Sequence, residues 1–273
     1  MADLAAGVAV ADALAGAVRR LASAGCDTPR LDAELLLASV LQVERGRLLL
    51  DRDRALDPEA LGEFESLLER REAREPVAYI LGRKAFRLIE LAVDRRALMP
   101  RPETELLVEV GLDLPRGWAV TDVGTGSGAV ALALKHERPD LLLTGTDVSG
   151  DALALARANG RRLGLDVSFV QGDLLAGVAC DAVLANLPYV EPGAHLAPEI
   201  TRYEPRSALF SGSDGLDAIR RLVPALGEVS LAALEIGSGQ AAPVTAMLSA
   251  AGFRAVEVLR DLAGLDRVLV ARQ

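Results

Sequence analysis

The hydrophobic pattern changes along the chain, and its first part is helical. Up to about residue 82, apolar positions recur at the three- and four-residue spacing of amphipathic helices. The stretches DTPRLDAELLLASVLQ and DPEALGEFESLLERRE each begin with a polar N-cap candidate, Asp27 or Thr28 in the first and Asp57 in the second, followed by a proline. We therefore predict a small all-α domain over residues 1–82. It carries no candidate chemistry, which favours a role in docking or support.

A different pattern occupies residues 83–102. Apolar and polar positions alternate in RLIELAVD, with Ile89, Leu91 and Val93 on one side, which predicts short extended strands. The two prolines of MPRPETE break this alternation, and a helix is expected to begin near Glu103. We predict a β-hairpin connector in this region.

From Gly117 onward, apolar runs typical of buried strands alternate with helical stretches. The runs are WAVTDVG, LLLTGTD, VSFVQGD, CDAVLANL, SLAALEIG, AVEVLR and RVLVARQ. Such alternation predicts a parallel sheet with helices on both faces. Only DLAGLD separates the last two runs, which is too short for a helical crossover, so that pair is expected to be an antiparallel hairpin. Residues 103–273 are thus predicted to form an α/β domain with a seven-stranded, mostly parallel sheet.

Composition and charge narrow the classes of partner. The net charge of −9 and the pI near 4.9 argue against binding to a polyanionic nucleic acid. The two cysteines, Cys26 and Cys180, lie far apart without metal-ligand spacing, so no metal site is predicted. No apolar run reaches the ~18 residues of a membrane span, and the N-terminus lacks the basic region of a signal peptide. These features favour a cytoplasmic enzyme or binding protein.

A glycine-rich turn, TDVGTGSGA, lies where the first strand of this sheet meets a helix. Gly124, Gly126 and Gly128 would let the backbone turn sharply and approach a ligand closely. Read literally, Gly124-x-Gly126-x-x-Ala129 also matches the dinucleotide fingerprint, so an NAD-linked oxidoreductase is one candidate. A tight strand-to-helix turn without a ligand is another.

Three later strand ends carry residues that would meet at the same rim of the sheet. Asp147 ends the second strand, where a carboxylate can accept both ribose hydroxyls of an adenosine, in NAD or in S-adenosylmethionine. Asp173 follows the third strand and can accept from an adenine amino group, while Leu174 packs on the ring. The fourth strand ends in the tetrapeptide NLPY, residues 186–189. Ligands of open α/β sheets bind beyond the carboxyl ends of the strands, so we expect one site there.

The NLPY tetrapeptide supplies no base and no nucleophile, but it can hold a planar NH2 group. A methyl group on a sulfonium is already activated, so its transfer needs an aligned nucleophile rather than an acid. The side-chain oxygen of Asn186 and the backbone carbonyl of Leu187 could accept the two NH2 hydrogens and stabilise the charge that develops on nitrogen. Pro188 would stiffen the loop, and the ring of Tyr189 would face the planar group. The alternative is a proline turn that only closes the strand.

Together these residues resemble the class I S-adenosylmethionine-dependent methyltransferases that carry an (N/D)-P-P-(Y/F) motif. With PRPETE, YEPRSAL and EIGSGQ, the chain is similar over about residues 30–273 to the release-factor glutamine methyltransferases, the HemK/PrmC family. The resemblance implies a Rossmann-like methyltransferase fold. It implies methyl transfer from S-adenosylmethionine, leaving S-adenosylhomocysteine, to N5 of the glutamine in the Gly-Gly-Gln motif of peptide chain release factors. It also implies that the helical domain contacts the release factor.

The resemblance, carried over by position, assigns residues to cofactor and substrate. The cofactor residues are Gly124, Thr125, Gly126, Ser127, Gly128, Asp147, Asp173, Leu174 and Asn186. The residues that hold the glutamine amide are Asn186, Leu187, Pro188 and Tyr189. The PRPETE segment is expected to border the site, with Arg101 and Glu103 as candidates that have no assigned role; Glu103 or Thr104 could equally cap the next helix.

Several alternatives stay open on the sequence alone. Leu187 stands where the family usually has its first proline, and NLPY is also typical of ribosomal RNA dimethyladenosine transferases. Adenine in nucleic acid and a glutamine of a ribosomal protein are therefore alternative substrates. An NAD-linked oxidoreductase would lack a residue assigned to handle hydride, and a non-catalytic module would only sense the cofactor. We expect a monomer without direct contact to nucleic acid or membrane.

Overall fold

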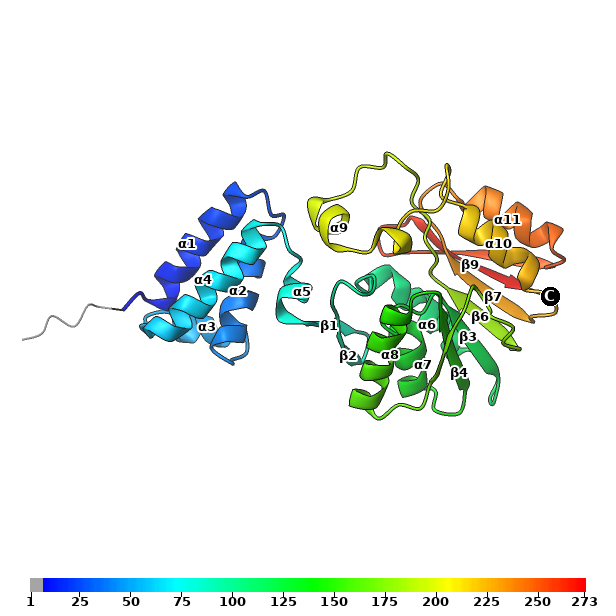
Figure 1. Ribbon diagram of the computed structural model, residues 1–273, viewed down its shortest axis with the longest axis horizontal. Coiled ribbons are helices and arrows are strands. Elements are labelled where there is room, and N and C mark those ends of the chain that lie inside the picture. The colour runs from blue at the N-terminus through cyan, green and yellow to red at the C-terminus, as the bar shows by residue number, and fades with distance from the viewer. Residues whose placement is uncertain (1–6) are drawn as a thin grey trace, which may run out of the picture. The chain divides into compact units, whose positions relative to one another are not determined.

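The computed structural model describes residues 7–273, which divide into two units. One unit holds the chain up to Gly82 together with Ala197–Tyr203, and the other holds Arg83–Leu196 and Glu204–Gln273 (Figure 1). The first six residues of the predicted helical domain lie outside the described part of the chain. The sequence gives no sign that residues 197–203 return to the helical unit, so this return is a feature of the tertiary structure.

The first unit is built from helices, which confirms the all-α prediction for this part of the fold. Its helices are α1 (Val10–Ser23), α2 (Pro29–Val40), α3 (Arg47–Leu50), α4 (Pro58–Glu72), α5 (Val77–Leu81) and α9 (Pro198–Tyr203). Leu21, Leu36, Phe64 and Leu68 are buried between them and form its core. The carboxylate of Asp57 accepts a hydrogen bond of 2.8 Å from the backbone N–H of Ala60, which is the expected N-cap of α4.

The start of α2 differs from the expected cap. Thr28 occupies the N-cap position, but its side chain makes no capping bond to the helix backbone. Its hydroxyl instead donates to Oδ1 of Asp32, at 2.8 Å. Asp32 is only 5% exposed and pairs with Arg71 of α4, so the threonine contributes to a buried polar network between two helices rather than to the helix end.

The short helix α9 is held on the first unit by side chains of α4 and of the turn that follows it. Glu199 accepts from Nε and Nη2 of Arg74, each at 2.7 Å, and pairs with Nη1 of Arg71 at 2.9 Å. The hydroxyl of Tyr203 donates to the carbonyl of Ala73 at 2.8 Å. A helix of six residues is too short to be stable by itself, so these contacts account for its formation.

The second unit begins with the expected hairpin. Strands β1 (Arg83–Phe86) and β2 (Ile89–Ala92) pair in antiparallel fashion. Ile89 and Leu91 are buried and Glu90 between them is exposed, as the alternation in the sequence predicts.

The main sheet confirms the predicted architecture. Its strands are β3 (Ala119–Val123), β4 (Leu142–Asp147), β5 (Ser168–Gln171), β6 (Ala182–Ala185), β7 (Leu231–Glu235), β8 (Ala255–Arg260) and β9 (Asp266–Arg272). Their order is β5-β4-β3-β6-β7-β9-β8, and β9 alone runs against its neighbours. The short DLAGLD connection thus produces the one reversed strand, because a tight turn can join only antiparallel neighbours.

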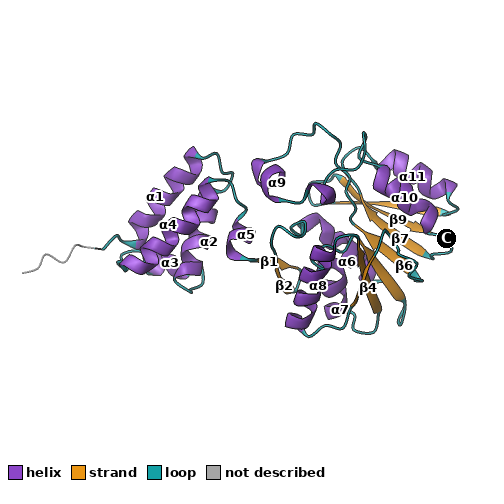
Figure 2. Ribbon diagram, viewed as in Figure 1, coloured by secondary structure: helices purple, strands orange, loops and turns teal. Residues whose placement is uncertain are grey.

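Helices cover both faces of this sheet (Figure 2). The helices of the second unit are η1 (Pro102–Thr104), α6 (Glu105–Leu112), α7 (Ala129–Glu137), α8 (Gly150–Leu163), η2 (Arg206–Ala208), α10 (Asp217–Ala225) and α11 (Ala241–Ala250). Helices α6, α7 and α8 lie on one face, and α10 and α11 lie on the other. Leu222 of α10 and Val244 of α11 are buried in one core cluster with Leu234 and Leu269 of the sheet, so the sheet is a rigid base for residues at its rim. Within residues 7–273, no helix has the length and apolar character to cross a bilayer.

Candidate active site

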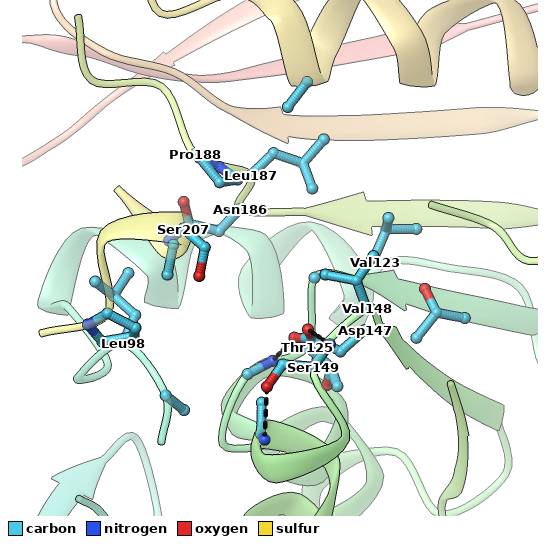
Figure 3. Close-up of a pocket in the computed structure, with 18 of the residues that line it drawn as sticks. Leu98, Val123, Thr125, Asp147, Val148, Ser149, Asn186, Leu187, Pro188 and Ser207 are labelled. Atoms are coloured by element: carbon cyan, nitrogen blue, oxygen red, sulfur yellow. Dashed lines mark hydrogen bonds between the residues drawn. The ribbon is translucent and has the colours of Figure 1, made fainter. Parts of the chain in front are cut away.

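The strand order reverses between β3 and β6, and a cavity lies at this switch point. From β3 the chain continues outward to β4 and β5, whereas β6 and β7 extend the sheet on the other side. Ligands of open α/β sheets bind beyond the carboxyl ends of the strands at such a reversal. The cavity there has a volume of about 410 Å³, within the range of small-molecule sites. Figure 3 shows its lining from two sides, with Asn186, Leu187, Pro188 and Ser207 opposite Thr125, Asp147 and Ser149.

Most residues singled out from the sequence meet at this cavity. Those that line it are Gly124, Thr125, Gly126, Ser127, Asp147, Asp173, Leu174, Asn186, Leu187 and Pro188. Gly128 and Tyr189 are outside the lining. A Cβ atom at Gly128 would lie 2.9 Å from Cδ1 of Leu132 and 3.2 Å from Cβ of Ala156, so this glycine is required by packing behind the turn.

The glycine turn is held from below by a residue that the sequence analysis missed. Asp122 of β3 is 2% exposed and accepts from the hydroxyl of Thr125 at 2.6 Å and from the N–H of Ala131 at 3.2 Å. Burial raises the pKa of its carboxyl to about 6. An aspartate inside a buried strand, shortly before a glycine turn, is the signal that could have identified it. It fixes the turn that faces the cavity.

The side chain of Asp147 is fixed by the same turn. Its Oδ2 accepts from the N–H of Gly126 at 3.0 Å, and its Oδ1 accepts from the N–H of Ser149 at 2.9 Å (Figure 3). Each carboxylate oxygen has a further lone pair, so Asp147 can still accept hydrogen bonds from a ligand in the cavity. The strand end thus supplies an acceptor whose position is set before any ligand binds.

At the end of β5, Asp173 has a partner that was not foreseen. It forms an ion pair with Arg221 of α10, and both side chains line the cavity. Leu174 adopts a positive φ of 50°, and its carbonyl accepts from the hydroxyl of Thr146 at 2.6 Å. This bond holds Leu174 in a conformation that is uncommon for a leucine, at the wall of the cavity.

The NLPY tetrapeptide follows β6, and the PRPETE segment contacts its first residue. Nδ2 of Asn186 donates to the hydroxyl oxygen of Thr104 at 3.0 Å. Thr104 precedes α6 but makes no side-chain cap there, so this bond, rather than helix capping, is what its side chain contributes. A side-chain amide accepts only through its oxygen, so Oδ1 of Asn186 is the atom that can accept a hydrogen bond from a ligand.

The PRPETE segment is tied to the EPRSAL segment at the cavity wall. Nη2 of Arg101 donates to Oε1 of Glu204 at 2.6 Å, and the side chain of Glu204 is fully buried. Burial raises the pKa of Glu204, whereas the arginine opposes this rise. Arg101 lines the cavity and Glu103 does not, so of the two site candidates in PRPETE it is Arg101 that borders the cavity. Ser207 of the EPRSAL stretch and Phe210 directly after it also line the cavity, and sequence reasoning did not assign either residue to the site.

Glu235 at the end of β7 lies behind the NLPY loop. It is 1% exposed, and burial raises the pKa of its carboxyl to about 7. The hydroxyl of Tyr189 donates to its Oε1 at 3.3 Å, and burial raises the pKa of Tyr189 to about 12. The tyrosine is therefore a hydrogen-bond donor at neutral pH, and the carboxyl accepts from it.

The raised pKa of Glu235 predicts how stability changes with pH in Glu235→Gln. The pKa of Glu235 is higher in the folded protein than in the unfolded chain, so the folded state prefers the protonated acid. The free energy of unfolding is therefore unaffected by this residue below its usual pKa near 4.5 and decreases as the pH rises through about 7. The neutral glutamine has no such loss. We expect the free energy of unfolding of the variant, relative to wild type, to rise by about 2 kcal/mol between pH 5.5 and 8.5. Thermal denaturation at the two pH values measures this; an equal difference at both would contradict it.

Comparisons with known proteins identify the fold and the family of this chain. Residues 12–82 match the model of the PrmC N-terminal domain, and residues 102–203 match the methyltransferase small domain. Among solved structures, a methyltransferase from Pyrococcus furiosus aligns with a TM-score of 0.54 at 16% identity, over 76% of this chain and 96% of that one. This likeness shows the methyltransferase fold.

Similarity to curated proteins is much closer. The release factor glutamine methyltransferase of Moorella thermoacetica is 43% identical over 95% of this chain and 96% of its own length. That of Rhodospirillum rubrum is 42% identical over 93% of this chain and 82% of its own length. Identity at this level over nearly the whole chain confirms the resemblance read from the motifs. It also excludes the alternative that the chain is an NAD-linked oxidoreductase. The chain belongs to the release factor glutamine methyltransferase family.

Proposed function

We propose that this protein transfers the methyl group of S-adenosylmethionine to N5 of the glutamine in the Gly-Gly-Gln motif of peptide chain release factors. The observation that carries this proposal is the hydrogen bonding of the Asn186 side chain. Its amide nitrogen donates to the hydroxyl oxygen of Thr104 at 3.0 Å, the residue lines the cavity, and its Oδ1 accepts no hydrogen bond within residues 7–273. An acceptor held in this way suits the NH2 group of a carboxamide.

The residues around the cavity fit an adenosine-bearing methyl donor. Asp147, already fixed by two backbone N–H groups, would accept the ribose hydroxyls, and Asp173 would accept from the adenine amino group. Gly124 and Gly126 have φ of +73° and +55°, so backbone rather than side chain faces this part of the cavity. S-adenosylmethionine supplies an electrophilic methyl group on a sulfonium, and S-adenosylhomocysteine is the product.

The chain's own residues would act by holding the acceptor nitrogen. The lone pair of a carboxamide nitrogen is delocalised, so the nitrogen is a weak nucleophile and positive charge develops on it during methylation. Oδ1 of Asn186 and the carbonyl of Leu187 would accept hydrogen bonds from its two N–H groups, fix its direction and stabilise that charge. As the nitrogen bonds to the methyl carbon, the bond from that carbon to sulfur breaks, and the nitrogen then releases one proton to solvent, which leaves a neutral methylamide. Leu187 is 6% exposed, and a Cβ atom at Gly124 would lie 3.1 Å from its Cδ2, so the leucine packs closely where the family usually has proline.

A labelling assay tests the substrate. The full chain is incubated with methyl-labelled S-adenosylmethionine and a purified release factor, and the peptide that contains Gly-Gly-Gln is analysed by mass spectrometry. We expect one added methyl group on its glutamine and none on a release factor in which that glutamine is replaced by asparagine. Label on a ribosomal-protein glutamine or on adenine in RNA, with none on the release factor, would reject the proposal in favour of one of those substrates.

Asp147→Ala is expected to weaken binding of S-adenosylmethionine by tenfold or more. Hydrogen bonds to a charged acceptor contribute about 1.5–3 kcal/mol each, and the alanine also releases the turn at Gly126. Isothermal titration calorimetry measures the dissociation constant. Asp151→Ala, which removes the same charge from the exposed start of α8, is the matched control and should change it little. Equal affinity of both variants would show that Asp147 is not a ligand of the ribose.

The two units would have separate parts in this function. We propose that the helical unit recognises the release factor and that residues 103–273 bind the cofactor and carry out the transfer. A substrate of the translation machinery places the enzyme in the cytoplasm. The chemistry requires a single cavity per chain, which is compatible with a monomer.

A further inference from the structure

Arg101 and Glu204 form an ion pair at the wall of the cavity, and no step described so far uses it. Nη2 of Arg101 donates to Oε1 of Glu204 at 2.6 Å. The side chain of Glu204 is fully buried, and its Oε2 has no hydrogen-bond partner within residues 7–273. A buried carboxylate that is held through one oxygen is costly for folding. Such a cost beside a cavity indicates a role in the site.

Arg101 keeps most of its hydrogen-bond donors available in this pair. A guanidinium has five N–H donors, and the bond to Glu204 uses one of them. Within residues 7–273, Nε and Nη1 of Arg101 donate to no other residue. The side chain is 22% exposed and lines the cavity. Glu204 thus holds one end of the guanidinium, while Nε and Nη1 are available to a ligand.

The backbone of Arg101 is tied to the residue that would hold the methyl acceptor. Its carbonyl accepts from the N–H of Thr104 at 3.1 Å, which closes the turn of η1. The hydroxyl oxygen of Thr104 in turn accepts from Nδ2 of Asn186 at 3.0 Å. Arg101 and Asn186 are therefore joined through a single residue, and both line the cavity.

Glu204 belongs to a segment that is attached to the chain after NLPY as well. The N–H of Val190 donates to the carbonyl of Leu209 at 2.8 Å, and the N–H of Ser211 donates to the carbonyl of Val190 at 3.1 Å. PRPETE, NLPY and EPRSAL are thus held together and line the same cavity. Of the residues that these three segments give to its lining, Arg101 alone carries a charge.

The chemistry of this pair selects among the acceptors that a ligand could present. Glu204 already neutralises Arg101, so the carboxylate of the methyl donor would add negative charge to a neutral, largely buried pair. A donor to the side-chain oxygen of the target glutamine would increase the delocalisation of the nitrogen lone pair and make that nitrogen a weaker nucleophile. A main-chain carbonyl has neither drawback, and two glycines before the glutamine present only main-chain groups.

We propose that Arg101 is a substrate-binding residue, which donates through Nε and Nη1 to a main-chain carbonyl of the segment that carries the target glutamine. Glu204 is its positioning residue. The substrate class is then an extended peptide with small residues beside the glutamine, because its carbonyl must approach a guanidinium that is only 22% exposed. This inference rests on the proposed function for the methylated group and adds how the neighbouring peptide is bound.

Binding of a peptide tests the role of Arg101. A fluorescent peptide that contains Gly-Gly-Gln is titrated with the full chain at saturating S-adenosylhomocysteine. We expect Arg101→Met to weaken peptide binding tenfold or more, since hydrogen bonds from a charged group are lost, and to leave the affinity for S-adenosylmethionine unchanged. Arg138→Met is the control, because Arg138 is 17% exposed and pairs with Asp140 outside the cavity lining.

Two results of this titration would overturn the proposal. One is equal peptide affinity in Arg101→Met and wild type, including the absence of binding in both. The other is a loss confined to the binding of S-adenosylmethionine, which would assign Arg101 to the carboxylate of the methyl donor.

Peptides that lack one carbonyl identify the acceptor. In three peptides an alkene replaces, in turn, the peptide bond between the glycines, the bond before the glutamine or the bond after it. One of them should bind wild type tenfold or more weakly and show no further loss with Arg101→Met, because both changes remove the same contact. Additive losses for all three peptides would overturn the assignment to a main-chain carbonyl.

Variants that differ in acceptor capacity test the role of Glu204. Glu204→Gln keeps an oxygen for Nη2 of Arg101 and should retain most of the peptide affinity. Glu204→Leu releases the guanidinium and should weaken peptide binding as much as Arg101→Met does. Thermal denaturation of both variants is measured alongside. A loss of stability in Glu204→Leu with unchanged peptide affinity would show that Glu204 does not position Arg101 for the substrate.

Because binding is measured without methyl transfer, failure of this inference is distinguishable from failure of the proposed function. Coupling between Arg101 and one carbonyl, with no methyl group found on the glutamine, would reject only the proposed function. Methylation of the glutamine with equal peptide affinity in Arg101→Met and wild type would reject only this inference.

Discussion

Replacing Asn186 with alanine is expected to lower kcat by roughly 10²-fold or more while affinity for S-adenosylmethionine changes little. Removal of one preorganised acceptor of transition-state charge typically has an effect of this size. The alanine also removes the 3.0 Å hydrogen bond to the hydroxyl of Thr104. That bond joins two residues of the protein and involves no atom of the methyl donor, so its loss should not change the affinity for S-adenosylmethionine. Single-turnover methyl transfer measures the first quantity and calorimetry the second.

Two further variants define what this result means. Asn186→Asp keeps an oxygen toward the cavity but cannot donate to Thr104, so it should retain part of the activity that the alanine loses. Gln171→Ala removes an amide at the end of the edge strand β5, outside the cavity lining, and should behave as wild type. If Asn186→Ala weakened only the binding of S-adenosylmethionine, the residue would be a cofactor ligand and not the holder of the acceptor.

Arg71→Met is expected to lower the stability of the helical unit by about 3–5 kcal/mol, the usual result of leaving a buried charge without its partner. Arg71 is 5% exposed and bridges Asp32 of α2 and Glu199 of α9, at 2.8 and 2.9 Å. Methionine fills much of the same space without the charge. Hydrogen exchange of backbone amides in α2, α4 and α9 of the full chain measures the opening free energy of this unit, which global denaturation of a two-unit protein does not isolate.

The matched control for this variant is Arg30→Met. Arg30 pairs with Glu34 one turn along α2, but its side chain is 81% exposed, so the pair should contribute less than about 1 kcal/mol. Equal effects at the two positions would show that the buried network gives no more stability than a surface pair. We also expect α9 to lose protection first in Arg71→Met, because Arg74 is then the one ion-pair partner that Glu199 keeps within residues 7–273.

The sequence by itself determined the elements and the rim at which the site lies. Periods of two and 3.6 residues are local signals, and they were sufficient for the hairpin at residues 83–92, the alternation after Gly117 and the reversed strand after DLAGLD. Parallel strands carry their carboxyl ends to one edge, so Asp147, Asp173 and Asn186 could be placed at one cavity before any coordinates were known.

Only the tertiary structure decided which side chains meet. Asn186 and Thr104 are 82 residues apart, Tyr189 and Glu235 are 46 apart, and Arg74 and Glu199 are 125 apart. No periodic pattern encodes such pairs, because a hydrogen bond between distant segments depends on how the sheet and its loops close around each other. For the same reason, the sequence did not show that Gly128 is a packing residue outside the cavity. Nor did it show that the buried carboxyls of Asp122 and Glu235 contact the glycine turn and the NLPY loop. Local periodicity fixes where the chain turns, whereas the closing of the fold fixes which atoms face each other.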